Sequence, residues 1–203
     1  CIIIGFADFD RKQKAIYNNG KKILVSNINA YLCDAPNVIV NSRNTPLCDV
    51  PKMIYGNKPA DGGNLIIEDV DYDEFITKDP YSKRYIKPLL GAVEYLHNKK
   101  RYCIWLQDIA PDEIRKCPMI INRIKEIREN SIAEGIRKFA NTPTLFAQIT
   151  QPSEGNYIII PRVSSEKRRY IPMGFLSSEI KVTDAVQIVP NASIYDFGIL
   201  TSN

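Results

Sequence analysis

Four short apolar runs in the last third of the chain limit most strongly how the sequence can fold. They cover residues 145–149, 157–160, 171–175 and 186–189, and turn-forming segments such as 151–156 separate them. Mainly apolar segments of four or five residues, bounded by glycine, proline, asparagine and serine, are typical of strands joined by short connections. The sequence therefore predicts an antiparallel sheet in this part of the chain.

One long amphipathic pattern precedes these strands and predicts a helix over residues 111–139. Pro118 predicts a break or restart within it, because a proline inside a helix removes a backbone hydrogen bond. Its apolar residues recur at three- and four-residue steps, as expected for a helix with one packed face; they are Ile114, Cys117, Ile121, Ile124 and Ile127. The predicted fold class is α+β, mainly antiparallel sheet with one or two amphipathic helices.

The first hundred residues carry weaker signals. Residues 1–6 form a continuous apolar run typical of a strand covered on both faces, and we expect it to be the last strand of a preceding domain. The sequence Asn18-Asn19-Gly20 predicts a hairpin turn. Residues 27–64 predict loops and short strands, residues 71–98 predict helical stretches broken at two prolines, Pro80 and Pro88, and residues 101–107 predict a strand.

The composition argues against several classes of protein. With only one histidine, His97, and no CxxC pair among its five cysteines, the chain offers no zinc site, so we expect no bound metal and reduced thiols. No apolar run approaches the roughly 18 residues of a membrane span, and no secretory leader is visible. We therefore expect a cytoplasmic protein with no membrane partner. Lysine and arginine outnumber aspartate and glutamate by 27 to 23, which modestly favours a polyanionic partner.

The sequence lacks the catalytic motifs that would make it a complete enzyme. A methyltransferase acting on adenine needs a glycine-rich loop for the methyl donor and an Asn/Asp-Pro-Pro-aromatic loop for a flipped base, and neither occurs. We interpret Asp79-Pro80-Tyr81 and Asp61-Gly62-Gly63-Asn64 as turns. The Glu179-Ile180-Lys181 segment supplies only half of a nuclease motif. No catalytic residue and no cofactor site are therefore assigned to this chain.

Two basic segments remain as candidate recognition surfaces. The loop within residues 160–172 concentrates side chains that read base edges and bind phosphates; they are Arg162, Ser164, Ser165, Glu166, Lys167, Arg168 and Arg169. The polar face of the predicted helix carries four more cations that could bind phosphates, Arg115, Arg123, Lys125 and Arg128. From composition alone, both segments also fit ordinary solvated surfaces, a charged hairpin and a charged helix face.

Six segments in one order resemble a known family. They are NINAYL at 27–32, PLCDVP at 46–51, YGNKP with DGGNL at 55–65, TPTLF at 142–146, the segment 160–172, and QIVPNA at 187–192. Together they resemble the region that follows the catalytic domain in MmeI-like single-chain restriction-modification enzymes and their stand-alone methyltransferase relatives. Collinear blocks across nearly the whole chain are far more specific than any single motif.

This resemblance implies that methyl transfer and DNA recognition belong to different domains of a longer parent protein. The parent would transfer a methyl group from S-adenosylmethionine to adenine N6 in double-stranded DNA, with the cofactor held by a catalytic domain in cis and none held by this fragment. Residues 1–25 would be the last strand and linker of that catalytic domain, and residues 26–203 the DNA target-recognition domain. Glu166 and Arg168 match the family's base-reading positions. Charge and spacing, rather than the resemblance, lead us to expect backbone or supporting contacts from Arg162, Ser164, Ser165, Lys167, Arg169, Arg115, Arg123, Lys125 and Arg128.

Two alternatives stay open on the sequence alone. The chain could be a stand-alone metal-dependent nuclease whose acidic residues are scattered along the sequence, and magnesium-dependent cleavage would reveal it. It could also be a protein-interaction module, which would show no salt-sensitive binding to DNA.

Overall fold

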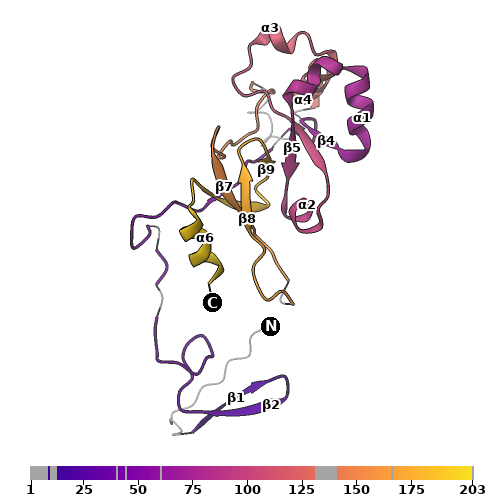
Figure 1. Cartoon of the computed structure of the whole chain (residues 1–203). Helices are drawn as coiled ribbons and strands as arrows, with labels where there is room; N and C mark the ends of the chain where they lie inside the picture. The colour runs from indigo at the N-terminus through magenta and orange to yellow at the C-terminus, as the bar shows by residue number, and fades with distance from the viewer. Residues whose placement is uncertain are drawn as a thin grey trace. The chain divides into compact units, whose positions relative to one another are not determined.

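The computed structural model divides the chain into two compact units, Cys1–Asp49 and Val50–Asn203 (Figure 1). It describes residue 9 and residues 13–39, 41–43, 45–59, 61–130, 141–165 and 167–202. The apolar run at residues 1–6, the helical prediction beyond residue 130, and Glu166 therefore lie outside the described residues. Each unit has its own architecture.

The first unit is built around the predicted hairpin. Strands β1 (Lys14–Asn18) and β2 (Lys21–Val25) pair antiparallel, with Asn18 opposite Lys21. Asn19 and Gly20 adopt φ angles of 49° and 76°, as the two central residues of a tight hairpin turn require. This confirms the turn predicted from Asn-Asn-Gly. The following loop is organised by Asn29, whose side-chain oxygen accepts hydrogen bonds from two backbone amides further along the chain.

A four-stranded antiparallel sheet forms one half of the second unit. Its strand order is β3 (Ile54–Tyr55), β10 (Val186–Pro190), β7 (Asn156–Pro161) and β8 (Gly174–Ser177). The predicted strands at 157–160 and 186–189 are confirmed, whereas the strand expected at 171–175 begins only at Gly174. The strand expected at 145–149 is wrong, because only Gln148 there makes an isolated bridge, to Lys58.

Both faces of this sheet are covered, at least in part. On one face Tyr157, Ile159, Val186 and Ile188 form a buried cluster with Val182. On the other face Ile158, Ile160 and Val189 pack against Phe197 and Leu200 of helix α6 (Ile194–Thr201). The α6 helix is capped by Ser193, whose hydroxyl accepts from the Asp196 amide, and Ser193 also donates to the Asp196 carboxylate. The sequence analysis did not predict this helix.

The other half of the second unit is a mixed sheet with helices packed on it. Its order is β4 (Ile66–Glu68), β6 (Arg101–Ile104), β5 (Ile86–Leu90) and β9 (Lys181–Val182), of which only β5 and β9 pair parallel. Around it lie α1 (Asp69–Lys78), the 3-10 helix η1 (Pro80–Tyr85), α2 (Ala92–His97), α3 (Pro111–Ile114) and α4 (Pro118–Asn130). The predicted α+β class is confirmed. No helix within the described ranges is long and apolar enough to cross a bilayer.

Proline positions explain two differences from the predicted elements. Pro118 does break the predicted helix, because α3 ends at Ile114 and α4 begins at the proline itself. The buried side chains are Cys117, Ile120, Ile124 and Ile127, so Ile120 rather than Ile121 lies deepest. Pro88, expected to break structure, lies inside β5. Since β9 pairs with β5 only from Leu89 onward, one side of the strand is open at Pro88, where a residue without an N–H is tolerated.

Segments far apart in the sequence meet at a buried amide network that joins the two sheets. The Asn57 side chain donates to Gln151 and to the Val182 carbonyl at 3.1 and 3.0 Å, and accepts from the Thr150 and Gln151 amides. Gln151 in turn donates to the Ser178 and Ile180 carbonyls. Because every polar atom of these two side chains is bonded, the network is both satisfied and specific.

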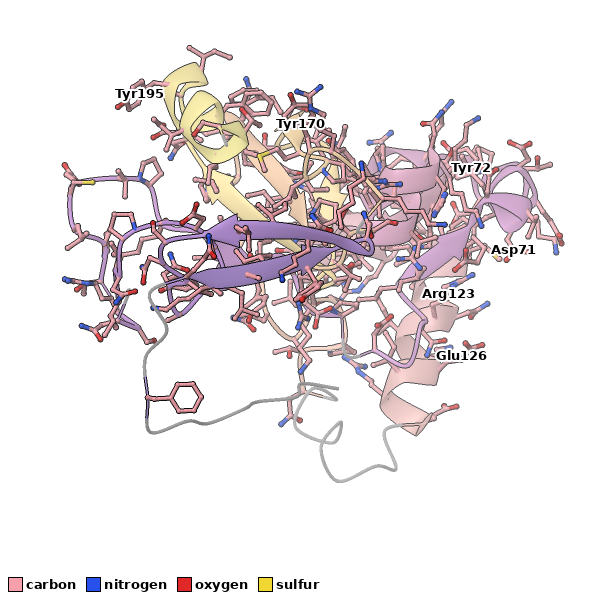
Figure 2. All side chains as sticks on the ribbon, turned by 90° about the horizontal axis from the view of Figure 1, so that it is seen from below. Asp71, Tyr72, Arg123, Glu126, Tyr170 and Tyr195 are labelled. Atoms are coloured by element: carbon pink, nitrogen blue, oxygen red, sulfur yellow. The ribbon has the colours of Figure 1, made fainter. Side chains whose placement is uncertain are left out.

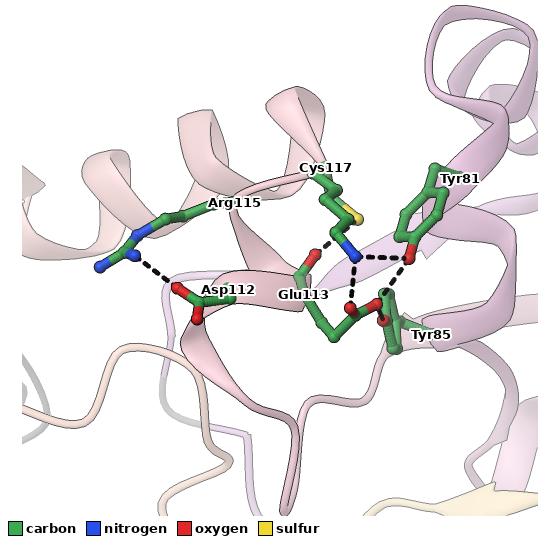
Figure 3. A network of polar contacts seen from close by, with 7 residues as sticks. Tyr81, Tyr85, Asp112, Glu113, Arg115 and Cys117 are labelled. Atoms are coloured by element: carbon green, nitrogen blue, oxygen red, sulfur yellow. Dashed lines mark hydrogen bonds and ion pairs between the residues drawn. The ribbon is translucent and has the colours of Figure 1, made fainter.

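A second polar network fixes α3 against η1 (Figure 3). The Glu113 carboxylate accepts from Lys116, from the Tyr81 hydroxyl and from the Tyr85 hydroxyl, the last at 3.2 Å. The hydrogen bonds from Lys116 and then from Tyr81 lower the pKa of Glu113 from 4.5 to about 2. A carboxyl whose pKa is lower in the folded state stabilises the fold above its ordinary pKa, and this contribution is lost as the pH falls toward 2.

Replacing Glu113 by glutamine should therefore destabilise the protein at neutral pH and matter progressively less in acid. We expect the variant's urea midpoint to lie below that of the wild type at pH 7, and the two midpoints to approach each other between pH 5 and pH 3. Asp112→Asn is the control. Asp112 and its ion-pair partner Arg115 are both largely exposed, and such pairs contribute little to stability. An equal difference between wild type and Glu113→Gln at pH 7 and pH 3 would contradict the assignment.

Candidate nucleic-acid interface

The predicted recognition loop joins β7 to β8 and extends from one end of the antiparallel sheet. Figure 1 shows it as the orange loop below β8, at the opposite end of this unit from α3. The chain leaves the sheet at Arg162, whose amide bonds the Ala185 carbonyl at 3.4 Å, and returns at Gly174. All described residues from Arg162 to Tyr170 are exposed. The strands thus anchor both ends of the loop, and its described side chains from residue 162 to residue 170 face solvent.

A turn shapes the tip of this loop. The Arg168 amide donates to the Ser165 carbonyl at 3.0 Å, and the Lys167 amide donates to the Ser165 hydroxyl at 3.3 Å. The backbone therefore turns between Ser165 and Arg168 and does not continue as an extended strand. Ser165 bends the chain by accepting local hydrogen bonds, as serine often does in turns. Its hydroxyl supports the loop backbone.

The loop's cations are available for a ligand. Within the residues that the structure describes, no ion pair involves Lys167, Arg168 or Arg169. The Arg169 guanidinium lies 5.2 Å from the centre of the Tyr170 ring, a cation–π contact at an exposed site. Among the residues with described positions, these three adjacent positive charges have no carboxylate partner. They repel one another, so an anion bound here would relieve that repulsion.

Arg162 is held more firmly than the tip of the loop. One guanidinium nitrogen donates to the Asp184 carbonyl at 3.2 Å, and the guanidinium carbon lies 5.1 Å from the centre of the Tyr55 ring. The sequence places Arg162 in the loop but gives no sign that Tyr55 is its neighbour. The contact depends on the pairing of β3 with β10, which brings residue 55 beside residue 187.

The four cations predicted on the helix face have different environments. Lys125 and Arg128 are exposed on α4. Arg115 is exposed as well, but it follows the last residue of α3 and pairs with Asp112. Arg123 is half-buried on α4 (Figure 2), where it donates to the carbonyls of Asn64 and Ile66, both at 2.9 Å. Arg123 thus fastens α4 to the start of β4, a role that the sequence did not reveal.

The segment Glu179-Ile180-Lys181, which matches half of a nuclease motif, makes structural contacts. Glu179 forms an ion pair with Lys87. Lys181 is buried, donates to the Ser178 carbonyl at 2.6 Å and lies 4.7 Å from the centre of the Trp105 ring. Burial lowers the pKa of Lys181. Across the described ranges, no group of three or more His, Cys, Asp or Glu side chains could hold a metal ion.

The fold and loop define the chain as an α+β protein with an exposed basic loop at the end of an antiparallel sheet, whose described cations form no ion pair. The family model described as MmeI, target recognition domain, matches residues 34–203, so the chain belongs to this family. It is also similar to DNA methyltransferase A of Bacillus subtilis (strain 168), with 38% identity over 205 residues.

A solved structure has the same fold. The type IIL restriction-modification enzyme MmeI in complex with DNA matches 96% of the chain with a TM-score of 0.79 and 36% identity. The chain covers 23% of the Bacillus protein and 27% of the MmeI chain, so it spans about a quarter of the length of these relatives.

Proposed function

We propose that this chain is the sequence-specific DNA-recognition domain of a longer, site-specific DNA methyltransferase that modifies adenine N6. The exposed loop of unpaired cations, in a chain of this family, is the observation that carries the proposal. Its support includes a relative named as a DNA methyltransferase and a relative solved in complex with DNA. A basic surface attracts the phosphate backbone, and arginine can bind guanine through two hydrogen bonds.

In this proposal the loop chooses the sequence and other cations hold the DNA in register. Glu166 and Arg168 read bases, because a carboxylate accepts from the cytosine amino group and a guanidinium donates to guanine. Support comes from the other loop residues and from the helix face: Arg162, Ser164, Ser165, Lys167, Arg169, Arg115, Arg123, Lys125 and Arg128.

The chemistry of methyl transfer is assigned to other parts of the longer protein. Residues 1–25 would connect to a catalytic domain in cis, which binds S-adenosylmethionine, and residues 26–203 would form the recognition domain. The whole protein would act in the cytoplasm on double-stranded DNA, with or without a fused nuclease.

Phosphate contacts from α4 should have a recognisable signature. In fluorescence-anisotropy titrations of the chain with 20-base-pair duplexes, affinity should fall steeply as salt increases. Replacing both Lys125 and Arg128 by alanine should weaken binding to every duplex alike. Because each phosphate contact contributes about −0.9 to the slope of log K against log salt, the double variant should have a slope shallower by roughly 2.

A charge-matched control separates a specific surface from net charge. Lys99 and Lys100 are exposed in the turn after α2, and replacing both by alanine removes the same charge. This control should leave the salt slope nearly unchanged. Failure of the wild-type chain and of the longer protein to bind any duplex would reject DNA recognition and favour a protein-interaction module. Magnesium-dependent cleavage by the chain would instead favour a nuclease.

A further inference from the structure

The antiparallel sheet presents one polar side chain at a position where its neighbours are apolar. In β10, Val186 and Ile188 enter the buried cluster on one face, and Val189 packs on the opposite face under α6. Successive side chains of a strand point to opposite faces. Gln187 therefore lies on the face that α6 covers in part, between two residues that point into the core.

Strand register aligns Gln187 with residues of both neighbouring strands. It is paired with Ile160 of β7 on one side and with Tyr55 of β3 on the other. Ile160 packs within the cluster beneath α6, whereas Tyr55 is 53% exposed. Three side chains therefore lie in a row across the sheet: Ile160 is covered by α6, Gln187 is half-buried, and Tyr55 is exposed.

Arg162 extends this row toward the recognition loop. It lies two residues beyond Ile160, and its guanidinium reaches across to the Tyr55 ring. The same open patch of sheet therefore carries a glutamine amide, a tyrosine ring and an arginine that starts the loop. No side-chain hydrogen bond involves Gln187 among the residues that the structure describes, so its amide donor and acceptor are available to a ligand.

We propose that Gln187 is a further base-reading residue, presented by the sheet itself rather than by the loop. This inference rests on the proposed DNA-recognition function. A glutamine amide carries a donor and an acceptor side by side, the pattern that matches N7 and the N6 amino group of adenine in the major groove. Because Gln187 is fixed in a central strand, it would read one base pair with little adjustment, beside the pair addressed by the loop.

The test compares Gln187→Leu with Gln107→Leu in the longer protein. Gln107 is also half-buried, but it lies after β6 in the other half of the unit, so it serves as a matched control. Sequencing of methylated sites and kcat/KM on duplexes with single base changes are measured for both variants. We expect Gln187→Leu to lose roughly tenfold or more discrimination at one position of the site. Gln107→Leu should match the wild type.

Other outcomes would overturn the inference. Unchanged sites and rates for Gln187→Leu would mean that the residue reads no base, and an equal loss on all duplexes would mean a backbone contact instead. If thermal unfolding shows that Gln187→Leu is not folded, Gln187→Glu replaces it, and it should disfavour adenine because the amide donor is gone. Arg168→Ala is measured in parallel. If Arg168→Ala alters the site and the Gln187 variants do not, only this inference fails; if the wild type recognises no site, the proposed function fails.

Discussion

Replacing Gly56 by alanine should lower the free energy of unfolding of the second unit by about 3 kcal/mol. A Cβ at this position would lie 2.3 Å from the Thr183 carbonyl oxygen and 2.9 Å from its carbon. Both are backbone atoms of the segment between β9 and β10, so the strain cannot be relieved by rotating a side chain. Relaxation would have to move Asn57 away from Val182, which would weaken the network that joins the two sheets.

Urea unfolding followed by the fluorescence of Trp105, the single tryptophan, measures this effect. Gly198→Ala is the matched control, because a Cβ there meets no atom within 4 Å and the residue lies in α6. Alanine is the better helix former, so this variant should be neutral or slightly more stable. If Gly56→Ala unfolded at the same urea concentration as Gly198→Ala, the sheets would not be as closely joined as the structure indicates.

Exchanging the charges of Glu166 and Arg168 should change the methylated sequence at one position. In the longer protein, Glu166→Lys replaces a hydrogen-bond acceptor by a donor, and Arg168→Asp replaces a donor by an acceptor. The double variant therefore presents the opposite pattern of donors and acceptors to the base pair. Because a good bidentate contact discriminates by about 1–3 kcal/mol, preference at that position should move by roughly one to two orders of magnitude. Sequencing the modified adenines of the double variant measures the change, and the other positions should be retained.

A charge exchange elsewhere provides the comparison. Glu74→Lys with Lys78→Glu reverses an exposed ion pair on α1, to which no DNA contact is assigned, and should leave the methylated sequence as it was. A double variant of the loop that kept both the wild-type sequence and wild-type activity would show that Glu166 and Arg168 do not read bases.

Local sequence signals predicted those parts of the fold that local chemistry determines. Asn19 and Gly20 can adopt positive φ, so the hairpin turn was visible in the sequence. Residues 157–160 are all buried, as are Val186, Ile188 and Val189, which explains why these two strands are mainly apolar. The segment 145–149 is equally apolar but forms no strand, since Phe146 is instead buried in the helical half of the unit, against Trp105. Only tertiary contacts distinguish these cases.

In the candidate site, too, the sequence predicted the local features and missed those that depend on distant residues. Its loop could be located from charge and flanking apolar runs, and the structure exposes that loop. The role of Arg123 could not be foreseen, because its partners are backbone carbonyls about 60 positions earlier in the chain. Gln187 left a faint signal, a polar residue between valine and isoleucine in an apolar run. Its exposed neighbour became visible only with the register of β3 against β10.

The pairing of β3 with β10 also determines when the second unit can fold during synthesis. Asn57 bonds Gln151 and Val182, which follow it by 94 and 125 residues. At about 5–20 residues per second, a ribosome needs on the order of ten seconds to make the chain between Asn57 and Val182. Asn57 lacks all of these partners until Thr150 and Gln151 have been made, and β3 stays unpaired until β10 follows. The contacts that hold β3 in the sheet therefore cannot form until the last strand has been made.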